Sequence, residues 1–331
     1  HYLIQRKGNI FMKAVRFHTN GGPEVLKYEE VDTPKPKNDE ALIKLEAAGV
    51  NYIDIYQRSG QYATPLPTTA GGEGSGTVVA IGSEVSEVAI GDVVAYTGPL
   101  GAYAEYAAVP AWRLVKLPAS INPSTAAALM LQGMTAHYLT HSTYPLKPGD
   151  TCLIHAAAGG VGLLLIQMAK KLGAQVIGTV STEEKAQLAR SVGADETIIY
   201  TQRDFEQEVR KITDGQGIEV VYDSVGKSTF DQSINCLAPR GCLVLYGQAS
   251  GPVPNIDPQI LNGKGSLFLT RPSLGHHTLT RSEILDRANT ILEWVSNGDL
   301  SVRIHATLPL NEAAEAHRLL ESRTTTGKII L

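Results

Sequence analysis

A glycine-rich segment, residues 155–162 with the sequence His-Ala-Ala-Ala-Gly-Gly-Val-Gly, carries the clearest chemical signal in the chain. Glycines let a backbone come close to a phosphate group, and the N-terminus of a helix offers free N–H groups and a positive dipole end. An apolar run at 151–154 precedes this segment, and apolar residues recur at helical spacing after it until Gly173. The pattern predicts a strand, a phosphate-binding turn and a helix.

Three small residues of the turn, Ala156, Gly159 and Gly162, have the spacing of the dinucleotide-binding fingerprint, with alanine at the first place. A glycine trio alone has a second interpretation, a tight turn needed only for packing. The residues that follow favour the first interpretation, because they predict strands at 175–180, 197–200, 219–223 and 242–246, with helices at 183–192 and 204–212. Apolar strands separated by helices indicate a parallel sheet covered on both faces, so we expect a dinucleotide-binding domain here.

The end of the second strand of this sheet distinguishes between the two nicotinamide cofactors. In NAD-selective sites an acidic residue stands there and binds the ribose hydroxyls. Here the strand ends in Ser181 and Thr182, and Lys185 follows. Glu183 and Glu184 are interpreted as acidic residues placed favourably in the first turn of a helix. A neutral strand end followed by a lysine favours NADPH.

Composition excludes several classes of function. The chain has 331 residues and a net charge of −4, and it has no basic stripe of the kind that binds nucleic acid. No apolar run approaches the roughly 20 residues that span a bilayer. The three cysteines are scattered, which fits a reducing cytoplasm better than a disulfide framework. Residues 1–11 precede a Met-Lys-Ala-Val start and are interpreted as an upstream extension or tag.

The first third of the chain has a different pattern. Short apolar runs punctuated by glycine and proline predict an all-β module, a partly open barrel. The expected strands are 12–17, 40–48, 76–81, 92–96 and 102–109.

The remaining segments complete the two parts. A helix is predicted at 124–140, with Ser124 as its N-cap. Beyond the parallel sheet we expect helices at 282–296 and 311–322 and strands at 304–308 and 327–331. The terminal piece is too short to fold alone, so it should return to the β module. Residues 265–270 are predicted to form the last strand of the parallel sheet, an edge that must be covered or paired.

From Met12 onward the chain resembles the zinc-free quinone oxidoreductases of the medium-chain dehydrogenase/reductase superfamily. The residues that carry the resemblance are dense and ordered along the chain. They are segments 48–54, 72–76, 91–94, 101–105, 132–136, 156–162, 221–226 and 270–273.

The resemblance implies an α/β fold, with a Rossmann doubly wound parallel sheet and a GroES-like, mostly β barrel domain. The implied domains are 12–132 with 272–331 for the GroES-like catalytic domain and 133–271 for the Rossmann NADP-binding domain, with the active site between them. A lysine and a tyrosine that hold the 2′-phosphate match Lys185 and Tyr200, and a C-terminal arginine matches Arg323. The full set expected to bind NADPH is Thr135, Ala158, Gly159, Gly160, Val161, Gly162, Ser181, Thr182, Lys185, Tyr200, Ser224, Gly247, Gln248 and Arg323. Two chains are expected to pair through the edge strand into a homodimer.

No metal is expected. The zinc alcohol dehydrogenases of the superfamily place a cysteine where Val50 and Asn51 lie, and a Gly-His-Glu where Gly72 and Glu73 lie. Both the cysteine and the histidine are absent from these places, and no Cys/His cluster has ligand spacing.

A quinone is electrophilic, so a hydride can reach it without metal activation, and the protein need only orient the two rings and exclude water. The side chains expected around the cleft are Asn51, Tyr52, Asp54, Tyr62 and Gln132. Gln132 departs from the lysine found in some close relatives, and Asp54 has a second interpretation as a structural acceptor. Two other functions remain open: an NADPH-dependent reductase of enones or 2-alkenals, and a non-catalytic NADPH-binding structural or RNA-binding protein, as lens crystallins of this family suggest.

Overall fold

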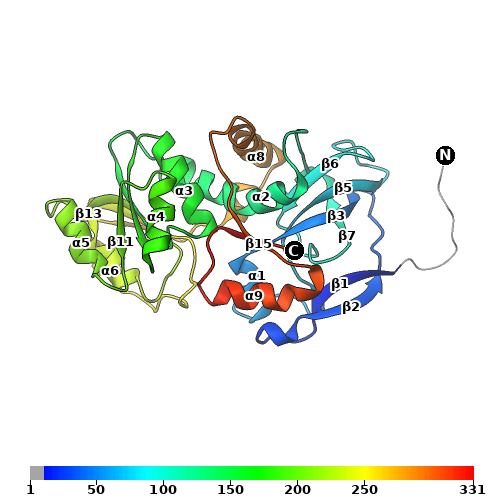
Figure 1. Cartoon of the computed structure of the whole chain (residues 1–331), viewed down its shortest axis with the longest axis horizontal. Helices are drawn as coiled ribbons and strands as arrows, with labels where there is room; N and C mark the ends of the chain where they lie inside the picture. The colour runs from blue at the N-terminus through cyan, green and yellow to red at the C-terminus, as the bar shows by residue number, and fades with distance from the viewer. Residues whose placement is uncertain (1–10) are drawn as a thin grey trace. The chain divides into compact units, whose positions relative to one another are not determined.

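The computed structural model describes residues 11–331, which form two compact units (Figure 1). The first unit ends at Met130 and takes up the chain again at Ile304–Leu331, and the second unit is Leu131–Arg303. The predicted boundary after residue 132 lies close to this division. Residues 272–303, which were expected with the β-rich part, belong to the second compact unit. The limits of the two functional domains, 12–132 with 272–331 and 133–271, stay a prediction.

The second unit is built on a six-stranded parallel sheet. Its strands are β9 (Thr151–Ile154), β10 (Gln175–Val180), β11 (Glu196–Ile199), β12 (Ile218–Asp223), β13 (Leu237–Leu245) and β14 (Phe268–Thr270). Their spatial order is β11-β10-β9-β12-β13-β14, which is the 3-2-1-4-5-6 order of the doubly wound fold. The order reverses between β9 and β12. Ligands of such sheets bind outside the carboxyl ends of the strands at this switch point.

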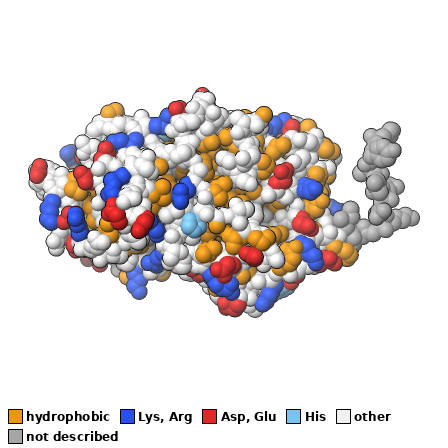
Figure 2. All heavy atoms as spheres, in the orientation of Figure 1, with side chains coloured by type: hydrophobic (Ala, Val, Ile, Leu, Met, Phe, Trp, Pro, Cys, Tyr) orange, Lys and Arg blue, Asp and Glu red, His pale blue; other side chains and the backbone are white. Residues whose placement is uncertain are grey.

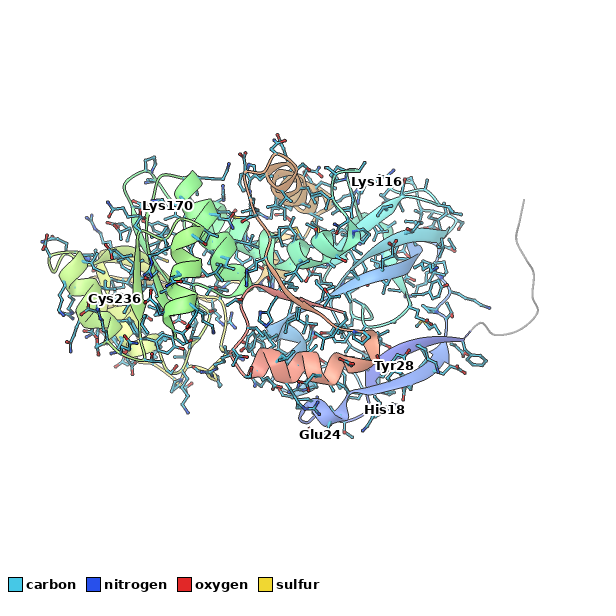
Figure 3. All side chains as sticks on the ribbon, viewed as in Figure 1. His18, Glu24, Tyr28, Lys116, Lys170 and Cys236 are labelled. Atoms are coloured by element: carbon cyan, nitrogen blue, oxygen red, sulfur yellow. The ribbon has the colours of Figure 1, made fainter. Side chains whose placement is uncertain are left out.

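Helices cover this sheet and fix its loops. They are α3 (Gly160–Lys171), α4 (Glu183–Ser191), α5 (Phe205–Ile212), α6 (Phe230–Asn235), α7 (Gln259–Gly263) and α8 (Arg281–Ser296), with the short turn η4 (Leu274–His277). Phe205, Val209, Phe230 and Ile234 of α5 and α6 form one hydrophobic core with the sheet. Lys170, labelled in Figure 3 near the end of α3, anchors that helix through an ion pair of 2.8 Å with Asp195.

The first unit is mostly β. It contains a three-stranded sheet in the order β2-β1-β4 and a seven-stranded sheet in the order β15-β16-β3-β5-β6-β8, with β7 paired to β3. The strands are β1 (Phe11–Phe17), β2 (Lys27–Asp32), β3 (Glu40–Val50), β4 (Thr68–Thr69), β5 (Glu73–Ile81), β6 (Val93–Thr97), β7 (Tyr106–Pro110), β8 (Val115–Lys116), β15 (Ile304–Thr307) and β16 (Lys328–Ile330). The helical elements are η1 (Pro23–Val25), α1 (Tyr52–Arg58), η2 (Ala111–Arg113), η5 (Leu310–Glu312) and α9 (Ala313–Glu321).

The C-terminal strand closes the first unit. β16 pairs antiparallel with β3, matching Ile329 with Val50 and Ile330 with Gly49. Ile329 joins the hydrophobic core formed by β1, β3, β5 and β6. Lys328, only 1% exposed, places its Nζ 2.6 Å from Oε2 of the fully buried Glu73. The late segment therefore supplies both apolar surface and a positive charge that neutralises this carboxylate.

Several sequence predictions need correction. Helix α2 (Pro123–Tyr138) begins one residue earlier than expected, and Asn122 rather than Ser124 caps it, because Asn122 Oδ1 accepts from the N–H of Thr125 at 2.8 Å. A π-helical turn, η3 (Leu139–Thr143), follows α2. The last parallel strand is β14 at 268–270, shorter than the predicted 265–270. Strand β2 and helix α1 were not anticipated.

The surface is mixed in character. On the face seen in Figure 2, positive and negative side chains are interspersed. Within residues 11–331 no helix has the length and apolar character needed to cross a membrane.

We predict that Lys328→Met lowers the free energy of unfolding by about 3–5 kcal/mol, because it leaves Glu73 buried without its counter-charge. Adding Glu73→Gln should recover part of the loss. Urea denaturation measures both, with Lys44→Met on the exposed side of β3 as the control. A Lys328 variant as stable as the control would contradict the role of the ion pair.

Candidate active site

The turn after β9 brings the chain into close contact with itself. Ala156 has a φ of +50°, a conformation that residues other than glycine rarely adopt. A Cβ on Gly162 would collide with the carbonyl oxygen of Ala156 and lie 2.7 Å from that of Ala157. Ala158 is buried in the same turn. Glycine is therefore required at 162 so that α3 can start directly over the turn.

The start of α3 faces helix α2. Gly159 is the N-cap, so the N–H groups of Gly160, Val161 and the next residue have no acceptor within the helix. A Cβ on Gly160 would collide with the side-chain amide of Gln132. Thr135 lies one turn further along α2 and is buried. The structure thus places Gln132 at the N-terminus of α3. The sequence analysis expected this residue among those around the cleft.

The ends of β10 and β11 form a second part of the same sheet edge. Val180 pairs with Ile199, so Ser181 and Tyr200 follow neighbouring strands at the same edge. The hydroxyl of Thr182 caps α4 by accepting from the N–H of Lys185 at 3.3 Å. Lys185 is half-buried, and this burial lowers the pKa of its ammonium group. Tyr200 is about half exposed.

The loops after β12 and β13 lie against each other. Asp223 ends β12, and its carbonyl oxygen accepts from the N–H groups of Tyr246 and Gly247. A Cβ on Gly247 would lie 2.5 Å from the carbonyl oxygen of Ser224, so this approach also requires glycine. Ser224, Gly247 and Gln248 are therefore neighbours, as expected for residues at the carboxyl ends of adjacent parallel strands.

In the first unit, Asn51 precedes helix α1, whose third residue is Asp54. Asp54 Oδ2 accepts from the backbone N–H of Asn51 at 2.8 Å, which satisfies one free donor at the start of the helix. The side chain of Asn51 is directed elsewhere. Its Oδ1 accepts from Lys328 Nζ at 2.6 Å, and its Nδ2 donates to Glu73 Oε2 at 2.8 Å and to the carbonyl oxygen of Gly49. The amide of Asn51 is thus fully engaged inside the unit.

A chain of hydrogen bonds runs from α9 to Asp54. Arg58 Nη1 lies 3.1 Å from His317 Nδ1, and because arginine only donates, Nδ1 accepts. Burial, reinforced by the charge of Arg58, lowers the pKa of His317 to about 3, so the ring is neutral and its proton sits on Nε2. Nε2 donates to Tyr103 Oη at 3.2 Å, and the Tyr103 hydroxyl donates to Asp54 Oδ2 at 2.9 Å. Glu321 completes the chain by pairing with Arg58 at 2.7 Å.

Asp54 nevertheless remains under-satisfied. Its Oδ1 is buried without a hydrogen-bond partner among residues 11–331. Burial raises the pKa of Asp54 to about 6, and the hydrogen bonds from Asn51 and Tyr103 only partly offset that effect. Asp54 therefore accepts hydrogen bonds within the first unit, which agrees with the interpretation of this residue as a structural acceptor, and its raised pKa lets it change protonation state near pH 6.

Two of the predicted tyrosines lie in one aromatic group. The ring of Tyr56 lies 6.1 Å from that of Tyr52 and 5.2 Å from that of Tyr62. Tyr52 Oη donates to the carbonyl oxygen of Leu320 at 3.0 Å, and burial raises its pKa while the nearby Arg323 opposes this. Arg323 has a φ of +59° in the turn after α9. Tyr52 and Arg323 are thus neighbours within the first unit.

Known proteins match almost the whole chain. Residues 37–119 match the family model described as "Alcohol dehydrogenase GroES-like domain", and residues 160–288 match the model described as "Zinc-binding dehydrogenase". A quinone oxidoreductase of Pseudomonas aeruginosa is 48% identical, over 96% of this chain and 99% of its own. The chain belongs to the quinone oxidoreductase family.

Two further relatives extend the comparison. The crystal structure of the Escherichia coli quinone oxidoreductase, a complex with NADPH, is 42% identical, with a TM-score of 0.93 over 96% of this chain and 99% of its own. A 2-haloacrylate reductase of Burkholderia sp. is 43% identical over 96% of this chain and 98% of its own. Membership confirms the predicted resemblance, the predicted oxidoreductase class and the two-part fold, and the NADPH complex agrees with the predicted cofactor.

The second family model is named for zinc, which makes the metal-ligating residues worth testing. Across residues 11–331 no three His, Cys, Asp or Glu side chains are grouped so that they could hold a metal ion. At the place where zinc relatives have a Gly-His-Glu, Glu73 is bonded to Lys328 and Asn51. His137 and His141 stack at 4.2 Å, but Arg287 lies 3.4 Å from His137 Nδ1. The donor set of a zinc site is therefore not assembled in the described part of the chain.

Sequence reasoning gave no role to five residues of the first unit, which are Arg58, Glu73, Tyr103, His317 and Lys328. One signal was present in the sequence, a lysine inside the apolar C-terminal strand. A buried charge needs a counter-charge, so this lysine implied a buried acidic partner. Nothing in the spacing identified Glu73 as that partner or placed His317 beside Tyr103.

We predict that the contribution of Asp54 to the free energy of unfolding falls by about 2–3 kcal/mol between about pH 4 and pH 6. A carboxyl group whose pKa is raised on folding binds its proton more tightly in the folded state, so its contribution is lost as the pH rises through the folded value. Asp54→Asn removes this contribution, so in urea unfolding series its stability relative to wild type should rise by the same amount over this pH range. Asp231→Asn, on an exposed position of α6, is the control, and a pH-independent difference between wild type and Asp54→Asn would contradict the assignment.

Proposed function

We propose that the protein is an NADPH-dependent quinone reductase. The observation that carries this proposal is the glycine turn at the switch point of the parallel sheet. There the N–H groups of the first three residues of α3, Gly160 to Gly162, have no acceptor within the helix and suit a phosphate. The family's NADPH complex supports the same cofactor. When bound, NADPH supplies a hydride to the substrate.

The residues proposed to bind the cofactor follow the strand ends. Gly159, Gly160, Val161 and Gly162, with Ala158 before them, face the pyrophosphate. Lys185 and Tyr200, with Ser181 and Thr182, hold the 2′-phosphate, since a half-buried lysine and three hydroxyls suit an extra anion. The nicotinamide end is assigned to Thr135, Ser224, Gly247 and Gln248, and Arg323 is also assigned to the cofactor.

The chain's own residues act on the substrate mainly by orienting it. A quinone accepts a hydride readily because it is conjugated and electrophilic, so aromatic and neutral hydrogen-bonding groups are sufficient. We assign Tyr52, Tyr62 and Gln132 to contact the ring and its oxygens. Asn51 and Asp54 are assigned a supporting role, because their polar groups are engaged in the buried network of the first unit. We retain 12–132 with 272–331 and 133–271 as the functional domains of this proposal.

A second substrate class has specific support. The 2-haloacrylate reductase relative is as similar to this chain as several quinone oxidoreductases are, and its name denotes reduction of a conjugated C=C bond. An enone or 2-alkenal accepts a hydride at carbon by the same chemistry. The two activities are therefore compared directly in the test.

The proposed function is tested by the consumption of NADPH in the presence of 1,4-benzoquinone, with 2-cyclohexenone and 2-chloroacrylate in parallel. We expect the quinone to give the highest kcat/KM and NADH to be a poor substitute for NADPH. Turnover restricted to the conjugated acids or enones would transfer the assignment to the second class. Absence of turnover with all of them, in protein that binds NADPH, would leave a non-catalytic role.

We predict that Lys185→Ala weakens NADPH binding by about 1–3 kcal/mol, the range for a charge-assisted hydrogen bond, and leaves NADH binding nearly unchanged. Titration of nicotinamide fluorescence measures both affinities. Lys264→Ala, at an exposed position after α7, serves as the matched control. Equal losses for the two cofactors would remove Lys185 from the 2′-phosphate site.

We also propose that two chains pair through β14. This strand lies at the edge of the parallel sheet, next to β13 alone, and presents Phe268 with 63% of its surface exposed. An exposed apolar edge strand invites pairing with a second copy, and twofold dimers are the usual result. The three cysteines are free and buried, which supports a cytoplasmic location, and the mixed surface charge supports a small-molecule rather than a nucleic-acid partner.

We predict a particle near twice 35.4 kDa in light scattering for the wild-type chain. Phe268→Asp should shift it toward the mass of one chain, because a carboxylate buried in an apolar interface is strongly unfavourable. Ile90→Asp introduces the same charge at an equally exposed position of the first unit and should leave the dimer intact. A wild-type monomer, or a dimer indifferent to Phe268→Asp, would count against this interface.

A further inference from the structure

Four fully buried polar side chains lie behind the loops at the switch point. They are Thr179 of β10, His155 after β9, Asp223 at the end of β12 and Ser233 of α6. His155 lies 2.8 Å from Thr179 Oγ1 through Nδ1 and 2.9 Å from Ser233 Oγ through Nε2. Ser233 Oγ lies 3.1 Å from Asp223 Oδ2. A continuous hydrogen-bonded chain therefore crosses three adjacent strands, in the spatial order β10, β9 and β12.

The direction of each hydrogen bond follows from the carboxylate. Asp223 Oδ1 accepts from the N–H groups of Val225 at 2.7 Å and Gly226 at 3.0 Å, and Oδ2 accepts from the Thr229 hydroxyl at 2.7 Å. Because a carboxylate accepts, the Ser233 hydroxyl also donates to it, so the Ser233 oxygen accepts from His155 Nε2.

The remaining proton position is then determined. Burial lowers the pKa of His155, although Asp223 opposes this, so the ring is neutral with its proton on Nε2. Nδ1 is left to accept from the Thr179 hydroxyl. Each hydrogen bond that links these four side chains thus has one direction, and the network has a single arrangement of its protons.

These residue types are those of a hydrolytic triad, but their arrangement is different. A nucleophilic serine donates its proton to histidine, which is held by the carboxylate. Here Ser233 lies between the histidine and the carboxylate and donates to the latter. It is also fully buried. The cluster is consequently not a nucleophile.

The network is connected to the turn after β9 and to the loop after β12. His155 is directly followed by Ala156, the residue of positive φ that begins the glycine turn. The Thr179 carbonyl oxygen accepts from the N–H of Ala157 at 3.1 Å. Asp223 fixes the loop that carries Ser224 through the N–H groups of Val225 and Gly226. A rotation of the His155 ring would therefore disturb the loops after β9 and β12 together.

We propose that His155 is a positioning residue that holds the turn after β9 and the loop after β12 in register, so that one cofactor molecule contacts both. The proposal rests on the proposed function, because it assigns NADPH to these loops. It predicts that loss of the ring's two hydrogen bonds weakens NADPH binding without a comparable effect on the quinone. It further predicts that an amide able to accept and donate restores most of the loss.

The test compares His155→Leu, which removes both hydrogen bonds, with His155→Gln, which retains a donor and an acceptor. We expect about a tenfold rise in KM and Kd for NADPH in His155→Leu, the effect of leaving buried polar groups unpaired, and less than about threefold in His155→Gln. KM for 1,4-benzoquinone should change less than about twofold in both. Thr140→Val removes an equally buried hydroxyl of the second unit outside the network and serves as the control.

The outcomes separate this inference from the proposed function. Wild-type protein that fails to bind NADPH would reject both. Wild-type protein that binds NADPH, with a folded His155→Leu variant that binds equally well, would overturn the positioning role and leave the function standing. Equal rises in KM for NADPH and quinone, with no rescue by glutamine, would reduce the network to general stability and also overturn it. If His155→Leu does not fold, Thr179→Val and Ser233→Ala decide, and unchanged NADPH affinity in both would overturn the inference.

Discussion

The contact between α3 and the turn that precedes it is the constraint on which the second unit depends. Gly162 lies against the carbonyl oxygens of Ala156 and Ala157, at a distance that excludes any side chain. That contact sets how closely the helix approaches the carboxyl end of β9. The neighbouring strands are parallel, so the loops at their carboxyl ends meet at the same edge of the sheet. The position of α3 relative to β9 therefore sets the space that these loops share.

In each unit a buried carboxylate accepts hydrogen bonds from more than one segment of the chain and holds them together. Asp223 accepts four hydrogen bonds, two from backbone N–H groups and two from hydroxyls. Asp54 accepts only two, both on one oxygen, and its pKa is raised to about 6. The two carboxylates therefore differ in how completely the described residues satisfy their oxygen atoms with hydrogen bonds. Each unit also holds a neutral histidine in one tautomer: His317 because Arg58 can only donate, and His155 because the Ser233 hydroxyl donates to Asp223 and so accepts from the ring.

The parts of the fold that repeat a local pattern could be predicted from the sequence, and the parts that depend on distant partners could not. The strands and helices from β9 to β12 follow from apolar runs, glycine stops and helical spacing, whereas the residues proposed to bind the cofactor stay a prediction. Strand β14 was predicted three residues too long, because Gly265 and Ser266 have positive φ angles of +119° and +57°, which an extended strand does not contain. Asn51 was expected to face a substrate, yet its amide is bonded to Lys328, which is 277 residues away in the chain. No local pattern contains that information, since it arises only when β16 pairs with β3.

The pairing of β16 with β3 also determines when each unit can be completed during translation. The second unit is continuous, so all its residues have been synthesised once the ribosome has passed Arg303. At that moment β3 and β5 have long been made, but Glu73 and Asn51 still lack the ammonium group of Lys328. Until Lys328 has been made, Glu73 has no counter-charge and β3 lacks the pairing with β16. The first unit can therefore be completed only after all residues of the second unit have been synthesised. The part of the chain that is synthesised first is thus the last part to reach its native state.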